Sequence, residues 1–263
     1  MTADPTTDPA AIRERALSAA VEAKGALYSL GGDYMSSQEA RTAAQDLALH
    51  GWTFYFAGRV GVLGRVPFEV VHAVTGFFPG DHVQKHWALA TDPSQSPPLD
   101  RVVDRYRDLQ RQWADAHLKG FPDDDAAELA DLLRDVAVTV ETGLSPLAAA
   151  WGTMPEPAAA RHRVVHWAHV LREQRGGLHI AAIQMAGLNP LEAIVTGSRG
   201  EAGARFYKWP EPYPTPDDSM RLFREEAEEI TDELASRAYR GLTEARAERL
   251  VELLNAAVAA SRD

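Results

Sequence analysis

Apolar positions recur along most of the chain with helical spacing, and no stretch alternates in the way a half-buried strand would. Glycine, proline and short polar side chains bound these stretches, as they do at helix ends. The pattern predicts helices over 10–30, 36–50, 81–87, 99–119, 124–141, 145–151, 162–175, 178–186, 191–196, 217–239 and 243–261. We expect loops at 91–98 and 208–216, and the predicted fold class is all-α.

The order of these elements is similar in two parts of the chain, which suggests an internal repeat. Gly51 and Gly177 each end a predicted helix, and a further glycine follows each of them after ten residues. The stretch PFEVV at 67–71 parallels PLEAI at 190–194. We predict two pseudo-repeated helical halves, 10–152 and 153–263, each with a helix-turn-helix-like unit and two long helices. They should pack as one globular unit behind a disordered tail at 1–9.

A histidine-rich stretch, RHRVVHWAHVLREQRGGLH at 161–179, is the centre of the candidate chemistry. On a helix, residues spaced by four, seven and eleven positions return to one face. His162, His166, His169 and Glu173 have this spacing and form one stripe. Gly176-Gly177 is expected to end the helix, so that His179 folds back toward the stripe.

The simplest alternative is that this stripe is the solvated face of an amphipathic helix. Apolar residues such as Trp167 and Leu171 lie on the opposite side. Solvated faces are usually rich in lysine, however, and this one has none. Imidazole and carboxylate at this spacing suit a metal site or a proton-transfer site.

Composition narrows the classes of function. The 263 residues contain no cysteine, which excludes disulfides, thiolate catalysis and cysteine-bound metals. The net charge of −11 argues against nucleic acid as a partner. There is no apolar signal core at the start and no apolar stretch long enough to span a membrane. We therefore expect a cytoplasmic protein.

One hypothesis is a metal centre. Carboxylate-bridged sites in helical bundles use Glu-x-x-His pairs that face ligands on another helix. Glu69 and His72 form such a pair, and His166, His169 and Glu173 would face it. Nitrogen and oxygen ligands of this kind suit Fe, Mn or Zn.

A second hypothesis is a small-molecule site without metal. Arg59 lies in an apolar run with Trp52 and Tyr55, and Arg175 lies beside the glycine pair. We expect these four residues to bind substrate, since arginine holds carboxylates in a bidentate manner. The catalytic residues would be His166, Glu173 and His179, acting by acid/base or metal-assisted chemistry. Alternatively, Arg59 forms a structural ion pair with Glu173.

Two motifs carry a resemblance to a known family: YFAGRVGVLGRV at 55–66 and HWAHVLREQRGGLHIAAIQMAGLNPLEAIV at 166–195. They resemble an actinobacterial family of mostly uncharacterised proteins that are described as helix-turn-helix-like, or MarR-like. The resemblance implies a winged segment after Trp209. That segment is missing here, where the sequence is the proline-rich KWPEPYPTP at 208–216.

These observations favour a small-molecule-binding helical protein. We expect it to be an enzyme that uses a His/Glu site, with or without metal, in the cleft between its halves. The alternatives are a transcriptional regulator of MarR-like, winged-helix origin and a non-catalytic ligand-binding protein. The segment PLEAIVTGS at 190–198 is too apolar to read a DNA groove, and EEAEE at 225–229 would repel phosphate. A homodimer is left open.

Overall fold

The computed structural model describes residues 8–262, and every regular element in that range is helical, which confirms the all-α fold class. The α-helices are α1 (Pro9–Leu30), α2 (Gln38–Asp46), α3 (Gly51–Val60), α4 (Phe68–Val74), α5 (Gly80–Thr91), α6 (Leu99–His117), α7 (Asp123–Ala137), α8 (Pro146–Gly152), α9 (Ala160–Met185), α10 (Pro190–Val195), α11 (Gly200–Phe206), α12 (Asp218–Ser236) and α13 (Glu244–Ala260). Short 3-10 turns are η1 (Asp33–Ser36), η2 (Gly61–Leu63) and η3 (Arg237–Tyr239). None of the described helices is long and apolar enough to cross a membrane.

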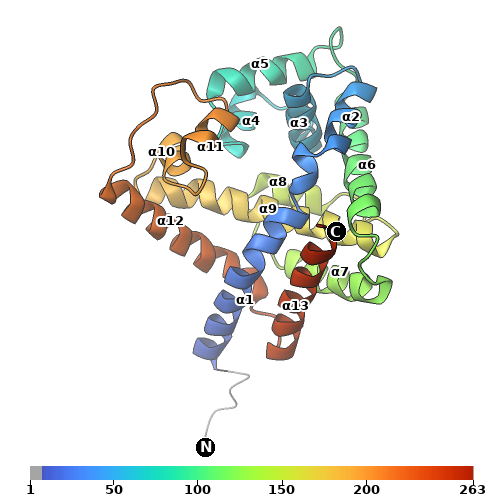
Figure 1. The fold of residues 1–263 in the computed structure, drawn as a ribbon, viewed down its shortest axis with the longest axis vertical. Coiled ribbons are helices and arrows are strands. Elements are labelled where there is room, and N and C mark those ends of the chain that lie inside the picture. Colours follow the sequence, from blue (N-terminus) through green and yellow to red (C-terminus); the bar gives the residue numbers. More distant parts are fainter. Residues whose placement is uncertain (1–7, 263) are drawn as a thin grey trace, which may run out of the picture.

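Helix α9 lies at the centre of the molecule, and α1, α6, α7, α8 and α12 all pack against it (Figure 1). Eight consecutive residues of α9, 164–171, are buried. A helix turns through more than two full turns over eight residues, so it is enclosed on every side there. This excludes the alternative of a solvated face, because three members of the stripe, His166, His169 and Glu173, lie inside the protein.

Helices from the two predicted halves pack into one core. Helix α1 packs against α12 and α13, and α7 packs against α9 and α13. A single cluster of buried apolar residues extends from Ala16 in α1 to Ala257 in α13. The correspondence between the two halves stays a prediction.

Most predicted helices are present, with a few changed ends. The tail prediction at 1–9 falls largely on residues 1–7, which lie outside the described residues. Its end is wrong, because the Asp8 carboxylate accepts a hydrogen bond from the Ala10 amide at 3.1 Å and caps α1. Helix α2 ends at Asp46, well before 50, since Ala48 has a left-handed backbone with φ of 54°. Helix α5 is longer than predicted, and α11 was not predicted.

The predicted helix end at Gly176-Gly177 is wrong, because α9 continues without a break to Met185. Gly177 has a different role, which is close packing. A Cβ atom there would meet the Leu144 carbonyl oxygen, and it would lie 2.6 Å from Ser145 Oγ. The segment before α8 can therefore approach α9 only because residue 177 lacks a side chain. Gly176 has open space around its Cα.

Helices α10 and α11 form a smaller apolar cluster beside the main core. Ile194, Val195 and Ala204 are buried in it, and Trp209 and Tyr213 of the proline-rich loop pack against them. The Trp209 indole donates a hydrogen bond to the Phe77 carbonyl at 2.9 Å. This contact fixes the loop after α11 to the connection between α4 and α5.

The two adjacent glycines of α9 should respond oppositely to alanine. Gly177→Ala should lower the free energy of unfolding by about 1–3 kcal/mol, because its Cβ is forced against the 144–145 segment. Gly176→Ala should raise it by up to about 1 kcal/mol, because alanine favours helix and the site is open. Urea unfolding of the two variants measures both effects. Similar changes in both variants would contradict the packing role of Gly177.

Candidate functional site

A cleft of about 450 Å³ lies between α1, α3, α9 and α12, with α10 and the start of α11 along its edge. It receives Tyr55 and Arg59 from α3, and Arg175 and His179 from α9. The sequence prediction had named all four. The remaining walls include aromatic and cationic side chains, aliphatic side chains and one carboxylate: Tyr28, Phe77, Phe78, Tyr207, Lys24, Arg172, Arg199, Arg224, Leu27, Val74, Leu171, Ile180, Ile194 and Glu228.

A second cavity of about 560 Å³ adjoins this cleft. Six residues line both spaces, so the two are contiguous: Tyr28, Tyr55, Phe78, Arg172, Arg199 and Tyr207. Trp52, also predicted to bind substrate, lines the second cavity only. Its ring contacts those of Tyr55 at 5.6 Å and Phe206 at 5.7 Å between centroids. We call the first space the arginine lobe and the second the tryptophan lobe.

The floor of the arginine lobe is a buried ion pair between α3 and α9. Arg59 donates from Nε to Glu173 Oε1 at 2.8 Å and from Nη2 to Glu173 Oε2 at 2.7 Å. Its third nitrogen donates to the Tyr55 hydroxyl at 2.7 Å. Arg172 adds a bond to Glu173 Oε1 at 3.0 Å. The exposed fractions of Glu173 and Arg59 are only 2% and 8%, so the predicted structural ion pair is confirmed.

The charge state of Glu173 follows from these contacts. Burial alone would raise its pKa, but the charge and hydrogen bonds of Arg59, with further help from Arg172, lower it to about 2. The carboxylate is therefore ionised at neutral pH and fully used by two guanidinium groups. Such a group holds the site in place, and it is a poor general base.

His179 lies on the opposite side of the arginine lobe. Its ring stacks on Phe77 with centroids 5.8 Å apart. Nδ1 lies 2.9 Å from the Thr231 hydroxyl, and Nε2 lies 3.0 Å from Nη1 of Arg224. Burial, and then the charge of Arg224, lower the pKa of His179 to about 4, so the ring is neutral at pH 7.

A network of charges on α12 faces this histidine. Arg224 pairs with Glu228 at 2.7 Å, and Arg175 pairs with Glu228 at 2.9 Å and with Asp232 at 2.7 Å. Lys24 also bonds Asp232, at 2.8 Å. Two carboxylates, Glu228 and Asp232, thus form ion pairs with three cationic side chains.

His166 does not join the cleft. It is buried with an exposed fraction of 2%, its ring packs edge-on against Trp167, and burial lowers its pKa to about 4. His166 and His179 are separated by thirteen positions of one continuous helix, or roughly 20 Å at 1.5 Å per residue. The predicted catalytic set of His166, Glu173 and His179 is therefore not brought together.

His169 is a core residue. It is fully buried, its ring packs edge-on against Trp151, and its Nδ1 lies 3.0 Å from the Tyr34 hydroxyl. Burial lowers its pKa to about 3, so it is neutral. His162, at the start of α9, bonds Asp115 at 2.7 Å near the surface.

The structure does not assemble the predicted metal ligands. Glu69 is exposed on α4, and the ring of His72 stacks on Phe68, with Nε2 lying 3.2 Å from the Phe78 carbonyl. Glu173 is held by two arginines. In the chain between residues 8 and 262, no group of three or more histidine or carboxylate side chains is placed to hold a metal ion.

Sequence reasoning missed several cleft residues. Arg172 stood inside the quoted motif, next to Glu173, but its side chain had no assigned role. Arg224 carried a helix signal that could have been used, since Arg224 and Glu228 are spaced to pair along α12. Arg199 lies between α10 and α11, and makes no ion pair with any other described residue; its guanidinium lies 4.7 Å from the centre of the Phe206 ring.

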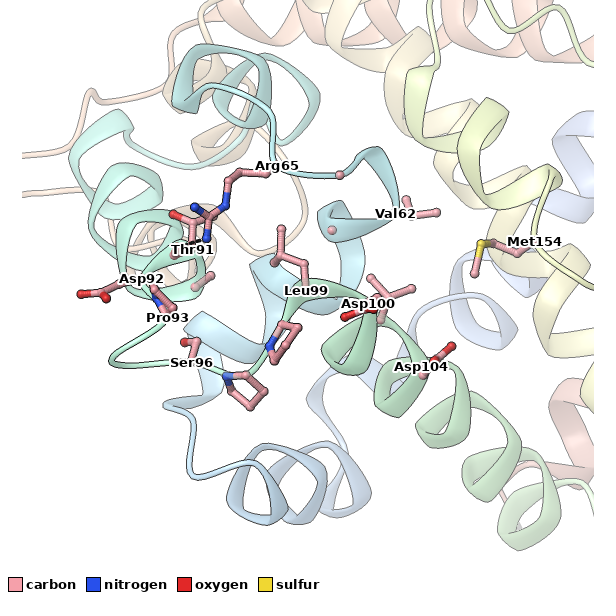
Figure 2. A pocket seen from close by; sticks show the side chains of 16 residues that line it. Val62, Arg65, Thr91, Asp92, Pro93, Ser96, Leu99, Asp100, Asp104 and Met154 are labelled. Carbon is pink, nitrogen blue, oxygen red and sulfur yellow. Dashed lines mark hydrogen bonds between the residues drawn. The ribbon is translucent and has the colours of Figure 1, made fainter.

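A further cavity of about 750 Å³ lies where η2, the end of α5 and the start of α6 meet (Figure 2). Arg65 donates to the Thr91 carbonyl there. The other charged groups of its walls are Asp92, Asp100 and Asp104. It contains none of the predicted catalytic, substrate-binding or metal-binding residues.

The sequence matches the model of a helix-turn-helix family over residues 14–263, which is nearly the whole chain. No curated protein matches it, and no solved structure matches it.

Glu173→Gln should lower the free energy of unfolding by about 3–5 kcal/mol, because it leaves buried Arg59 without its counter-charge. Urea unfolding at pH 7 measures the loss. Arg246→Gln breaks an exposed ion pair with Asp135 and is the control, with an expected change of less than about 1 kcal/mol. Equal losses of unfolding free energy in the two variants would show that the buried ion pair stabilises the fold no more than the exposed one.

The effect of Glu173→Gln should also depend on pH. Because the folded pKa of Glu173 is about 2 against an ordinary 4.5, its ionised form stabilises the folded state. This contribution is fully present above pH 4.5 and is lost as the pH falls through 2. The difference in unfolding free energy between the two proteins should therefore shrink over that interval. A difference that stays constant would contradict the ionised state of Glu173.

Proposed function

The chain belongs to a helix-turn-helix family, and from this premise we propose that it binds an anionic aromatic small molecule in the arginine lobe. The observation that carries the proposal is the local charge. Six cationic side chains line this lobe: Lys24, Arg59, Arg172, Arg175, Arg199 and Arg224. Five of them share three carboxylates, Glu173, Glu228 and Asp232, and Arg199 pairs with none of the three. Six minus three leaves an excess of three positive charges, in a chain whose net charge is −11.

The aromatic walls support the second part of the proposal. Phe77, Phe78, Tyr55 and Tyr207 line the arginine lobe, and Tyr28 stands at its edge with 56% of its surface exposed. Clefts that are mostly apolar, with a few converging charged groups, are typical of small-molecule sites. Aromatic rings also stack well on planar ligands and on arginine.

For the enzyme hypothesis, His179 is the best supported of the predicted catalytic residues. It is neutral, it lines the cleft and it is oriented by Thr231. Acid/base chemistry on the bound molecule would use this ring. Metal-assisted chemistry would need ligands that the described residues do not bring together, so the proposal assigns no metal. A non-catalytic binding protein would use the same cleft.

Family membership favours a second candidate, a DNA-binding regulator of MarR-like type whose cleft binds an effector. Helix-turn-helix proteins read DNA with a helix that enters the major groove. Here α10 has six residues, and Ala193, Ile194 and Val195 are buried. This helix offers no basic side chain to a groove, so we rank DNA binding below ligand binding. The actinobacterial and MarR-like assignments stay predictions.

The proposal predicts that the protein binds an anionic aromatic ligand much more tightly than a neutral ligand of similar shape. The carboxylate 1-naphthoate should bind the full-length protein measurably in titration calorimetry, and the neutral isostere 1-naphthalenemethanol should bind at least tenfold more weakly. Arg199→Met should weaken 1-naphthoate binding about tenfold or more, since a charge-assisted hydrogen bond contributes about 1.5–3 kcal/mol. Arg221→Met is the control, because Arg221 lies exposed on α12 outside the cleft. Equal binding of the acid and the alcohol would contradict the proposal.

The second candidate is tested with the same protein. Fluorescence anisotropy with a mixed pool of duplex DNA at physiological salt should show no retention if α10 is a buried structural helix. Retention that 1-naphthoate releases would make the regulator the better function.

A further inference from the structure

The proton on His179 can be placed from its neighbours. Thr231 Oγ1 donates to the Ala227 carbonyl at 2.6 Å. A hydroxyl has only one proton, so this oxygen can only accept from His179 Nδ1, at 2.9 Å. His179 is neutral and carries a single ring proton, which must therefore lie on Nδ1. Nε2 is left as a hydrogen-bond acceptor.

Arg224 donates a hydrogen bond to His179 Nε2. An anion in the cleft would attract the same guanidinium group more strongly than this neutral nitrogen does. Its Nη1 lies 3.0 Å from His179 Nε2 and 2.7 Å from Glu228 Oε1. Its Nε is buried and has no hydrogen-bond partner among residues 8–262. An anion attracts the Arg224 guanidinium by charge as well as by hydrogen bonding, and a bidentate contact adds a second bond, whereas the neutral imidazole offers one acceptor without charge. An anion in the arginine lobe should therefore take Arg224 away from His179.

This exchange has a consequence for the imidazole. Once Arg224 has turned to the anion, His179 Nε2 lies inside the cleft without a donor. Leaving a buried acceptor unpaired is costly, whereas a ligand that supplies a donor avoids the cost. Sites built around a hydrogen bond to a substrate hydroxyl discriminate strongly against analogues that lack it.

We propose that the ligand carries a hydroxyl group next to its anionic group, so that Arg224 binds the anion while His179 Nε2 accepts from the neighbouring hydroxyl. The ligand class is thus a hydroxy acid with an aromatic body. This inference rests on the proposed function and narrows it. His179 is the residue that determines the specificity.

The test uses acids that differ only in the hydroxyl. Phenylacetate is compared with mandelate, and 3-phenylpropanoate with 3-phenyllactate, by titration calorimetry on the full-length protein at pH 7. In each pair the hydroxy acid should bind roughly ten- to a hundredfold more tightly. In His179→Phe, which keeps a flat ring against Phe77, the preference should fall to less than threefold, because both acids of a pair then meet the same apolar ring. Thr231→Val removes the hydroxyl that accepts from Nδ1, so the neutral ring of His179 can carry its proton on either nitrogen. The preference for the hydroxy acid should fall in this variant as well.

The position of the proton on His179 can also be measured directly, without any substitution. Nitrogen-15 NMR of the His179 imidazole at pH 7 should show Nδ1 protonated and Nε2 unprotonated, with and without mandelate. Protonated Nε2 would overturn the proposal. Equal binding of acids and hydroxy acids would overturn it and leave the proposed function standing. If none of the four acids binds but 1-naphthoate does, this specificity is wrong; if no acid binds at all, both proposals are wrong.

Discussion

The ion pair between Arg59 and Glu173 is the contact on which the arrangement of the cleft depends. It joins α3 to the central helix α9 with two parallel hydrogen bonds inside the protein. Removing two charges from water costs several kcal/mol per ion, and only good geometry and additional bonds offset this. Tyr55 and Arg172 supply those additional bonds. The pair fixes the spacing of the aromatic walls on α3 relative to the cations on α9.

The same pair determines which charges remain available to a ligand. Glu173 offsets one of the two positive charges of Arg59 and Arg172, and its bonds to both guanidinium groups hold them in a rigid polar floor. Arg224 and Arg199 are different. Arg224 pairs with Glu228, which also pairs with Arg175, and it donates one hydrogen bond to the neutral imidazole of His179. The Arg199 guanidinium lies over the ring of Phe206. One positive charge of the excess therefore stays with Arg59 and Arg172, and the other two lie at Arg199 and in the network of Lys24, Arg175 and Arg224.

The sequence was sufficient for the class of fold and for most helices, because helical periodicity and end signals are local. It misplaced the chemistry of α9 for a physical reason. Periodicity identifies a polar stripe, but it cannot show that a helix is enclosed on all sides, with His169 bonded to Tyr34 and Glu173 to Arg59 from other parts of the chain. Gly177 was misread in the same way, since a glycine that permits close packing and a glycine that ends a helix look alike in sequence. Arg59, Tyr55, Arg175 and His179 were found because charged or polar residues in an apolar setting are locally unusual. Arg199 and Arg224 were missed because they reach the cleft only through tertiary packing.

Membership of a helix-turn-helix family is compatible with a ligand-binding cleft if the family name refers to the order and connection of the helices and does not imply a surface that reads DNA. Fold alone does not determine function, which depends on the groups at a site. In this chain α10, which the Gly187 turn joins to α9, has Ala193, Ile194 and Val195 buried and lines one edge of the arginine lobe. The proline-rich loop follows α11 and is held to Phe77 by Trp209, where the resemblance implied a wing. Both α10 and the segment around Arg199 thus help to enclose the arginine lobe, a small space with an excess of positive charge.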